Sequence, residues 1–129
     1  MILNLNVLDS DNTLVKCELN VEELNNEVLL SLIMKDEIYQ EKDTFPFVAL
    51  CNLRLILEKQ KRKICCKGNR LDVYSSGSTL VGFNAYMLKI GKPANDNDII
   101  CLFDEEIEFD KLSSVNEQEE YFYKWIESL

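Results

Sequence analysis

Short segments of β-type residues, separated by brief clusters of turn formers, restrict this chain to a small set of folds. Residues 2–8 alternate apolar side chains with asparagine, and residues 13–19 return to β-type residues after the turn formers at 9–12. The two segments predict a β-hairpin with one solvent-facing side, at or near the edge of a sheet. Connections of this length are too short for repeated helical crossovers between parallel strands. We therefore expect an α+β fold in one domain, residues 1–129, in which a mostly antiparallel sheet of five or six strands carries two or three helices on one face.

Two stretches have the start signals and the apolar spacing of helices. In the first, Thr44 or Phe45 is the expected cap, and Pro46 fits the first turn because an N–H there has no partner within the helix. Its inward side is predicted to consist of Phe47, Leu50, Cys51, Leu53 and Leu57. The charged residues are expected in solvent: Arg54, Glu58, Lys59, Lys61 and Arg62. Later in the chain, Ser114 and Glu117 fit a capping box that opens a second helix, whose inward side is predicted to be Val115, Tyr121 or Phe122, Trp125, Ile126 and Leu129.

The remaining segments are assigned from shorter patterns. Residues 21–34 fit helical spacing better than alternation, although 28–34 also fit a buried strand, and the polar residues 36–43 predict a loop. A turn at 67–70 separates two short strands, at 64–66 and 71–74. An exposed loop is expected at 75–78, the longest strand at 79–90 with a bulge at Gly82, a turn at 91–98, and a strand apolar on both faces, near the sheet centre, at 99–103.

The composition is that of an ordinary globular protein that folds on its own, with 47% hydrophobic and 29% charged residues. The first residues do not have the pattern of a secretory signal and no apolar run approaches the ~20 residues of a membrane span, so we expect a cytoplasmic protein without a membrane partner. Five cysteines, no histidine and no C-x-x-C pair favour buried thiols over disulfides or zinc. We expect no metal and no cofactor.

Charge is distributed unevenly along the chain. Residues 93–129 hold eleven carboxylates and two lysines, whereas residues 61–92 hold seven cations and one carboxylate; the whole chain has a formal charge of −9. A negative field attracts basic partners and repels phosphates, so the expected partner is a basic macromolecule and not a nucleic acid. In the basic segment, Arg70, Tyr74 and Tyr86 could serve phosphate contacts and stacking. The competing interpretation is that this segment neutralises the acidic ends of the chain folded beside it.

Catalysis is not expected. Histidine, the most frequent general base, is absent, and the glycines do not form a phosphate-binding loop. The carboxylates at 104–110 are the obvious pool for glycosidase chemistry, but so many acids in one short segment are more often a solvated face. We interpret residues 104–110 as a loop or edge segment that places its carboxylates on the outer surface.

Four stretches of the second half share a pattern with known proteins: 45–54 (FPFVALCNLR), 66–77 (CKGNRLDVYSSG), 85–86 (AY) and 91–94 (GKPA). The pattern resembles that of small bacterial proteins found beside polymorphic and contact-dependent growth-inhibition toxins, which are grouped as immunity proteins. The resemblance covers roughly residues 45–129. The usual central loop has proline before Ser-Gly and methionine after it, where this chain has Ser75 and Ser78.

The resemblance implies a stoichiometric inhibitor that binds the toxic domain of an effector, commonly a basic nuclease, without catalysis. The expected partner-binding residues are Asp104, Glu105, Glu106, Glu108, Asp110, Glu117, Glu119, Glu120 and Tyr123. The alternative is a small ligand-binding or regulatory module with a pocket near Arg70, Asp72, Tyr74 and Ser76. In either case we expect a monomer or a weak dimer.

Overall fold

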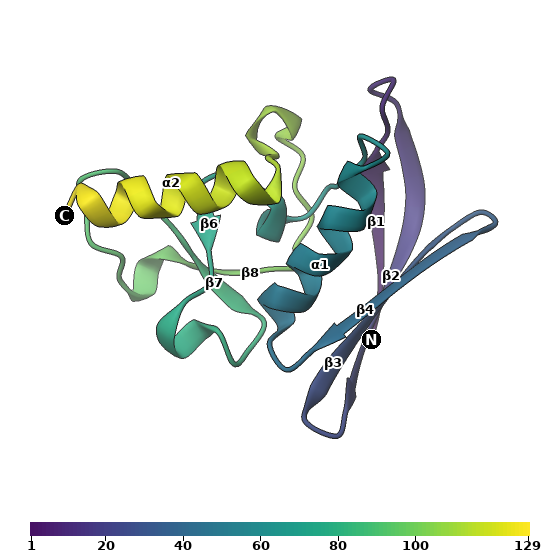
Figure 1. The fold of residues 1–129 in the computed structure, drawn as a ribbon, viewed down its shortest axis with the longest axis horizontal. Helices are drawn as coiled ribbons and strands as arrows, with labels where there is room; N and C mark the ends of the chain where they lie inside the picture. The colour runs from purple at the N-terminus through teal and green to yellow at the C-terminus, as the bar shows by residue number, and fades with distance from the viewer.

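A five-stranded antiparallel sheet curled around helix α1 forms one side of the molecule, and a smaller three-stranded sheet with helix α2 forms the other (Figure 1). The computed structural model describes residues 1–129. The large sheet has the order β4-β3-β2-β1-β5 and contains β1 (Ile2–Leu8), β2 (Leu14–Leu24), β3 (Glu27–Met34), β4 (Glu37–Asp43) and β5 (Lys63–Ile64). The small sheet has the order β6-β7-β8 and contains β6 (Val73–Tyr74), β7 (Asn84–Met87) and β8 (Ile99–Cys101). Both helices, α1 (Pro46–Glu58) and α2 (Val115–Glu127), lie on the same side of the large sheet, which confirms the predicted α+β class.

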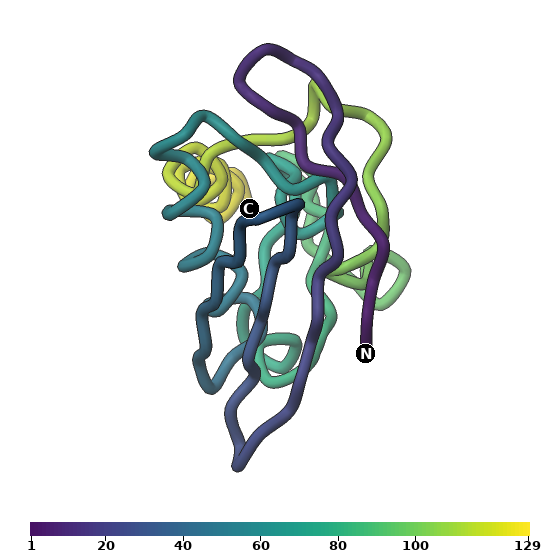
Figure 2. The backbone as a smooth tube through the Cα atoms, turned by 90° about the vertical axis from the view of Figure 1, so that its right-hand side faces the viewer, coloured from purple at the N-terminus to yellow at the C-terminus, as the bar shows by residue number.

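Asparagines make the tight turns that join the long strands. Asn25 and Asn26 both have left-handed backbones, with φ of 48° and 69°, which is the geometry of a two-residue hairpin turn that matches the twist of its strands. The turn joins β2 to β3 in register from Leu24↔Glu27 onward. The predicted helix over residues 21–34 is therefore wrong, and the buried-strand alternative for 28–34 is correct. Figure 2, seen almost along α2, shows β1 to β4 running side by side.

The polar segment 36–43 is strand β4 and not the predicted loop. It pairs with β3 over seven residues, from Met34↔Glu37 to Val28↔Asp43. Because β4 is the edge of the sheet, it needs few apolar residues, and charged side chains on an edge discourage pairing with other chains. The polar composition of this edge strand is therefore easily mistaken for that of a loop.

Helix α1 fills the inner side of the large sheet. Pro46 opens it after the extended residue Phe45, as predicted, although no side chain caps the first turn. One face of α1 packs against the inward residues of the strands in a core that includes Leu19, Leu30, Leu32, Leu50, Leu53 and Leu57, all fully buried. The prediction that Arg54 faces solvent is wrong, since this residue is only 2% exposed.

The small sheet differs most from the sequence-based expectation. Residues 79–90 contain only the four-residue strand β7, and Gly82 lies in a turn before it and not in a bulge. In the loop expected to be exposed, Ser75 is buried and its hydroxyl donates to the carbonyl of Asn84. Strand β8 is the edge of the small sheet and not its centre, although Leu102 and Phe103 beyond it are buried.

Helix α2 begins with the predicted capping box of Ser114 and Glu117. It packs on β6, where the ring of Phe122 stacks on Tyr74 with centroids 4.0 Å apart. Ile126 and Leu129 are exposed, contrary to prediction, and the one fully buried residue of the helix is the polar Gln118. Neither helix is long and apolar enough to cross a membrane.

Candidate functional site

Backbone hydrogen bonds fix the start of the acidic segment 104–110 against the chain that follows β5. The amide of Lys67 donates to the carbonyl of Asp104 at 2.8 Å, and the amide of Glu106 donates to the carbonyl of Cys65 at 3.1 Å. Cys66 and Glu105 form an isolated antiparallel bridge between these contacts. The first half of the segment therefore behaves as a short added strand with a defined register.

Glu106 is the anchor of this segment. Its side chain is 3% exposed, and Oε1 accepts a 2.8 Å hydrogen bond from Nη1 of Arg70. The Lys67 ammonium lies 3.8 Å from the same oxygen, and the amide of Glu108 donates to Oε2. Burial alone raises the pKa of Glu106, but the hydrogen bonds from Arg70 and the Glu108 amide, with the two cations, outweigh burial and lower this pKa below its usual range. The prediction that Glu106 lies on the outer surface is wrong.

Arg70 joins three carboxylates at one point. Its Nε and Nη2 donate to Asp72 at 2.8 and 3.0 Å, a bidentate arrangement, and Nη1 reaches Glu108 at 3.1 Å as well as Glu106. These hydrogen bonds raise the pKa of Arg70 above its usual value, and those to Asp72 contribute most. We call Arg70, Asp72, Glu106 and Glu108 the Arg70 cluster. The guanidinium is already fully engaged by the protein's own carboxylates.

The other two residues of the predicted loop site also have local partners. Tyr74 packs edge-on against Phe47 at 5.0 Å and stacks on Phe122. Ser76 precedes a single 3₁₀ turn, Gly77–Thr79, where its amide donates to the Thr79 hydroxyl. Arg70 and Asp72 therefore connect the small sheet to the acidic segment, Tyr74 connects it to the helices, and Ser76 stabilises its own turn.

Five residues of segment 104–110 are exposed around the buried anchor. Asp104, Glu105 and Asp110 are exposed carboxylates that form no ion pair, and the side chain of Glu108 is 60% exposed although it touches Arg70. Between them, the apolar Ile107 is 72% exposed. Three free carboxylates and one apolar side chain thus stand on a backbone that a buried ion pair holds in place.

The predicted residues of α2 form a separate group. Glu117 is part of the capping box, and hydrogen bonds from Ser114 lower its pKa. Glu119 and Glu120 are exposed in the first turns, where carboxylates also favour the helix dipole. Tyr123 is 55% exposed. No hydrogen bond or ion pair connects these side chains to the Arg70 cluster.

The basic middle segment neutralises acids from both ends of the chain. Arg62 contacts Asp9 at 3.3 Å and Glu37 at 2.9 Å, while Arg70 contacts Glu106 and Glu108. The arginines of this segment are thus paired with carboxylates, as the competing interpretation of the charge pattern predicted. Their pairing leaves the acidic segment with an excess of free carboxylates.

A buried polar link holds the two halves of the molecule together. Arg54 donates from Nη1 to the Gln118 side chain at 2.6 Å and from Nη2 to the Ser113 carbonyl at 3.1 Å. The Gln118 amide nitrogen donates to the carbonyls of Gly68 and Arg70, both at 2.8 Å. Burial lowers the pKa of Arg54. Sequence reasoning missed this link because Arg54 was predicted to face solvent and Gln118 was not among the inward residues predicted for the second helix.

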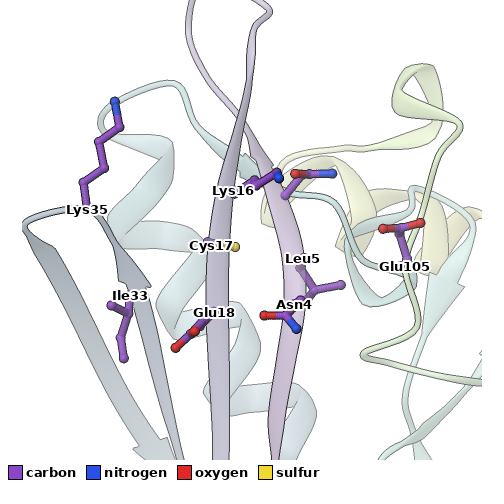
Figure 3. Close-up of a pocket in the computed structure, with 9 residues that line it drawn as sticks. Asn4, Leu5, Lys16, Cys17, Glu18, Ile33, Lys35 and Glu105 are labelled. Carbon is purple, nitrogen blue, oxygen red and sulfur yellow. The ribbon is translucent and has the colours of Figure 1, made fainter.

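The largest cavity is a groove of about 650 Å³ on the outer side of the large sheet (Figure 3). Glu105 forms its wall beyond β1, which connects the groove to the acidic segment. Its charged side chains, Lys16, Lys35, Glu18 and Glu105, have no hydrogen bond or ion pair. The lining residues are Asn4, Leu5, Asn6, Lys16, Cys17, Glu18, Ile33, Lys35 and Glu105. The signal for this groove was present in the alternating polar residues of β1 and β2, which face away from α1.

No protein-family model matches this chain, and no curated protein matches it. The structure contains no group of three or more histidine, cysteine, aspartate or glutamate side chains arranged to hold a metal ion. The candidate site is an exposed acidic segment, with its backbone held by hydrogen bonds, next to an open groove.

Proposed function

We propose that this chain is a cytoplasmic immunity protein, which binds a basic toxin domain in a one-to-one complex and thereby neutralises it. The observation that carries the proposal is the Arg70 cluster, because it buries Glu106 while Asp104, Glu105 and Asp110 of the same segment are exposed without ion partners. The resemblance of residues 45–129 to immunity proteins supports the same function. No catalytic step is proposed.

The physical reason is electrostatic complementarity. A domain that cleaves nucleic acid must attract phosphates and is therefore basic, so an acidic inhibitor competes for the same surface. Opposite fields accelerate encounter by orders of magnitude at low salt, and like charges exclude wrong partners. Rigid carboxylates also reduce the entropy lost on binding, since their backbone is ordered before the partner arrives.

The exposed Ile107 fits this role. Interfaces combine a desolvated apolar centre with a polar rim, and Ile107 stands between the exposed carboxylates of segment 104–110. Tyr123 on α2 is a second exposed side chain of the kind enriched at interfaces. We propose Asp104, Glu105, Glu108, Asp110, Ile107 and Tyr123 as contact residues, with Glu117, Glu119 and Glu120 contributing to the field.

The test uses the basic terminal domain of the effector encoded beside this gene, carrying an inactivating substitution. We expect a one-to-one complex by gel filtration with light scattering, and an association rate that falls steeply as salt rises. The double variant Asp104→Asn, Asp110→Asn should lower that rate about tenfold. Its matched control, Glu23→Gln with Asp36→Asn, removes two exposed charges outside the segment and should have little effect. Equal rates for the two double variants, or no complex with the unchanged protein, would contradict the proposal.

A further inference from the structure

The groove on the outer side of the large sheet has charges of opposite sign at its two ends. Glu18 pairs in register with Asn4 on β1 and with Ile33 on β3, so these three side chains form one row across the strands. Lys16, two residues before Glu18, pairs with Asn6 in the next row on the same side of the sheet, and Lys35, in the turn after β3, also lines the groove. Figure 3 shows the two lysines at one end, and Glu18 and Asn4 at the other.

The charges of this groove are uncompensated. Two ammonium groups, those of Lys16 and Lys35, line the groove, and neither forms an ion pair with a carboxylate. Glu18 at the other end, and Glu105 on the wall beyond β1, lack a cation. The side chains of Asn4 and Asn6 form no hydrogen bond, which leaves an amide donor and acceptor free at each end. The charged and polar side chains of the groove thus lack hydrogen-bond and ion-pair partners within this chain, and a bound partner could supply them.

We propose that this groove docks an extended segment of the partner, which carries a basic residue against Glu18 and Glu105 and an acidic residue against Lys16 and Lys35. This inference rests on the proposed function and specifies how the basic toxin domain is recognised. The two charged rows are two residues apart, or about 7 Å along a strand. The partner segment therefore has its opposite charges two residues apart on one face when it is extended.

The dimensions and the walls of the groove suit such an occupant. A volume of about 650 Å³ accepts several side chains, and known ligand sites are of this size. Ile33 supplies an apolar surface on its floor. Glu105, on the far wall, is held by the backbone bridge to Cys66 and by the anchored Glu106 next to it. The groove is thus continuous with the acidic segment, so that one partner can contact both surfaces.

Charge-swap variants test the inference at constant net charge. The double variant Lys16→Glu, Glu18→Lys exchanges two of the four charges of the groove and so removes its charge pattern, and its cross-strand neighbours Asn4, Asn6 and Ile33 are uncharged, so the swap creates no repulsion with them. The control Glu22→Lys, Lys42→Glu swaps charges on the same outer side of the sheet, outside the groove. Both variants keep the chain at −9, so long-range attraction of the basic domain is unchanged.

We expect calorimetry with the inactivated basic toxin domain to show at least tenfold weaker binding for the groove swap, and a change under about twofold for the control. Thermal unfolding checks that both variants fold. Independently, the side-chain amide signals of Asn4 and Asn6 should shift in the complex of the unchanged protein, whereas those of Asn20 should not. Unchanged affinity of the folded groove swap, or unshifted Asn4 and Asn6 signals, would overturn the inference while leaving the proposed function intact. No binding by the unchanged protein would overturn both.

Discussion

The Arg70 cluster allows a quantitative test of how the acidic segment is held. Replacing Arg70 with methionine keeps much of the side-chain volume but removes the only guanidinium next to Glu106, whose side chain is 3% exposed. Asp72 and Glu108 are more exposed, at 25% and 60%, and can return to water. Glu106 cannot, because backbone hydrogen bonds at Asp104 and at Glu106 itself fix its segment against residues 65–67.

The expected loss of stability follows from this difference in exposure between Glu106 and the other two carboxylates. Removing one partner of a buried ion pair destabilises a protein by about 3–5 kcal/mol, because the other charge is left buried and unpaired. Lys67, 3.8 Å from Glu106, compensates part of the loss, so we expect a value near the lower limit, about 3 kcal/mol for Arg70→Met. Glu106→Gln should cost about 1–2 kcal/mol, since Arg70 keeps Asp72 and Glu108 and loses one charged hydrogen bond.

Urea unfolding followed by circular dichroism at pH 7 measures these values. The double variant Arg70→Met, Glu106→Gln should be more stable than the sum of the single effects predicts, by about 1–2 kcal/mol, because the glutamine no longer leaves a buried charge. Arg62→Met is the control: Arg62 also contacts two carboxylates, but at the surface, and should lose under about 1 kcal/mol. Strict additivity of the two substitutions, or equal losses for Arg70→Met and Arg62→Met, would refute the reasoning.

The pH dependence gives a second measurement on the same variants. The pKa of Glu106 is lowered in the folded protein, so its charged form stabilises the fold above the ordinary carboxyl pKa, and this contribution is lost as the pH falls through the lower folded value. In Arg70→Met, protonation at low pH removes the unpaired negative charge of Glu106. The stability difference between the unchanged protein and Arg70→Met should therefore narrow as the pH falls from about 5 to about 3. A difference that is constant with pH would mean that Glu106 is not the group left unpaired.

Three further outcomes are expected. Gln118→Leu should destabilise the fold by about 2–4 kcal/mol in urea unfolding, since it removes the 2.6 Å acceptor of the buried Arg54 charge. Gly68→Ala should destabilise by about 1–3 kcal/mol, because the added Cβ would lie 2.5 Å from Leu50 Cδ2, whereas Gly82→Ala, with no atom within 4 Å, should not. Iodoacetamide at pH 8 should modify at most the two partly exposed thiols of the native chain, Cys51 and Cys101, and all five thiols after unfolding. The other three thiols are protected because burial raises the pKa of Cys17 to about 12, that of Cys65 to about 11 and that of Cys66 to about 12.

The parts of the fold that sequence reasoning predicted well are those with a local signal. Pro46 at the start of α1 and the capping box of Ser114 and Glu117 mark helix ends by chemistry that needs no tertiary contact. The alternation in residues 2–8 likewise depends only on one buried face. These elements are present at the predicted places.

The predictions that were wrong concern elements that depend on tertiary contacts. Whether residues 21–34 form a helix or a hairpin was decided by two left-handed asparagines, Asn25 and Asn26, and by the inner side of the sheet that accepts Val28, Leu30 and Leu32. Strand β4 is polar because it is an edge. A pattern of single residues cannot show which strand will be at the edge of a sheet.

The candidate site was predicted in outline only. The location of the acidic segment followed from composition, but its anchor did not, because nothing local distinguishes Glu106 from Glu105. The difference arises from Arg70, which is 36 residues away in the sequence and reaches only one of the two carboxylates. The groove was missed for a similar reason, since its rows are formed by three strands and a distant segment.

The contact between Arg54 and Gln118 has a consequence for how the chain is made on the ribosome. The strands of the large sheet and α1 are synthesised first, and they place a cation in the interior more than sixty residues before its acceptor appears. Until Gln118 emerges, hydration of that guanidinium opposes closure of the inner layer. The contact thus couples the two halves of the chain, because closure of the inner layer around Arg54 is most favourable once α2 has placed Gln118 beside it.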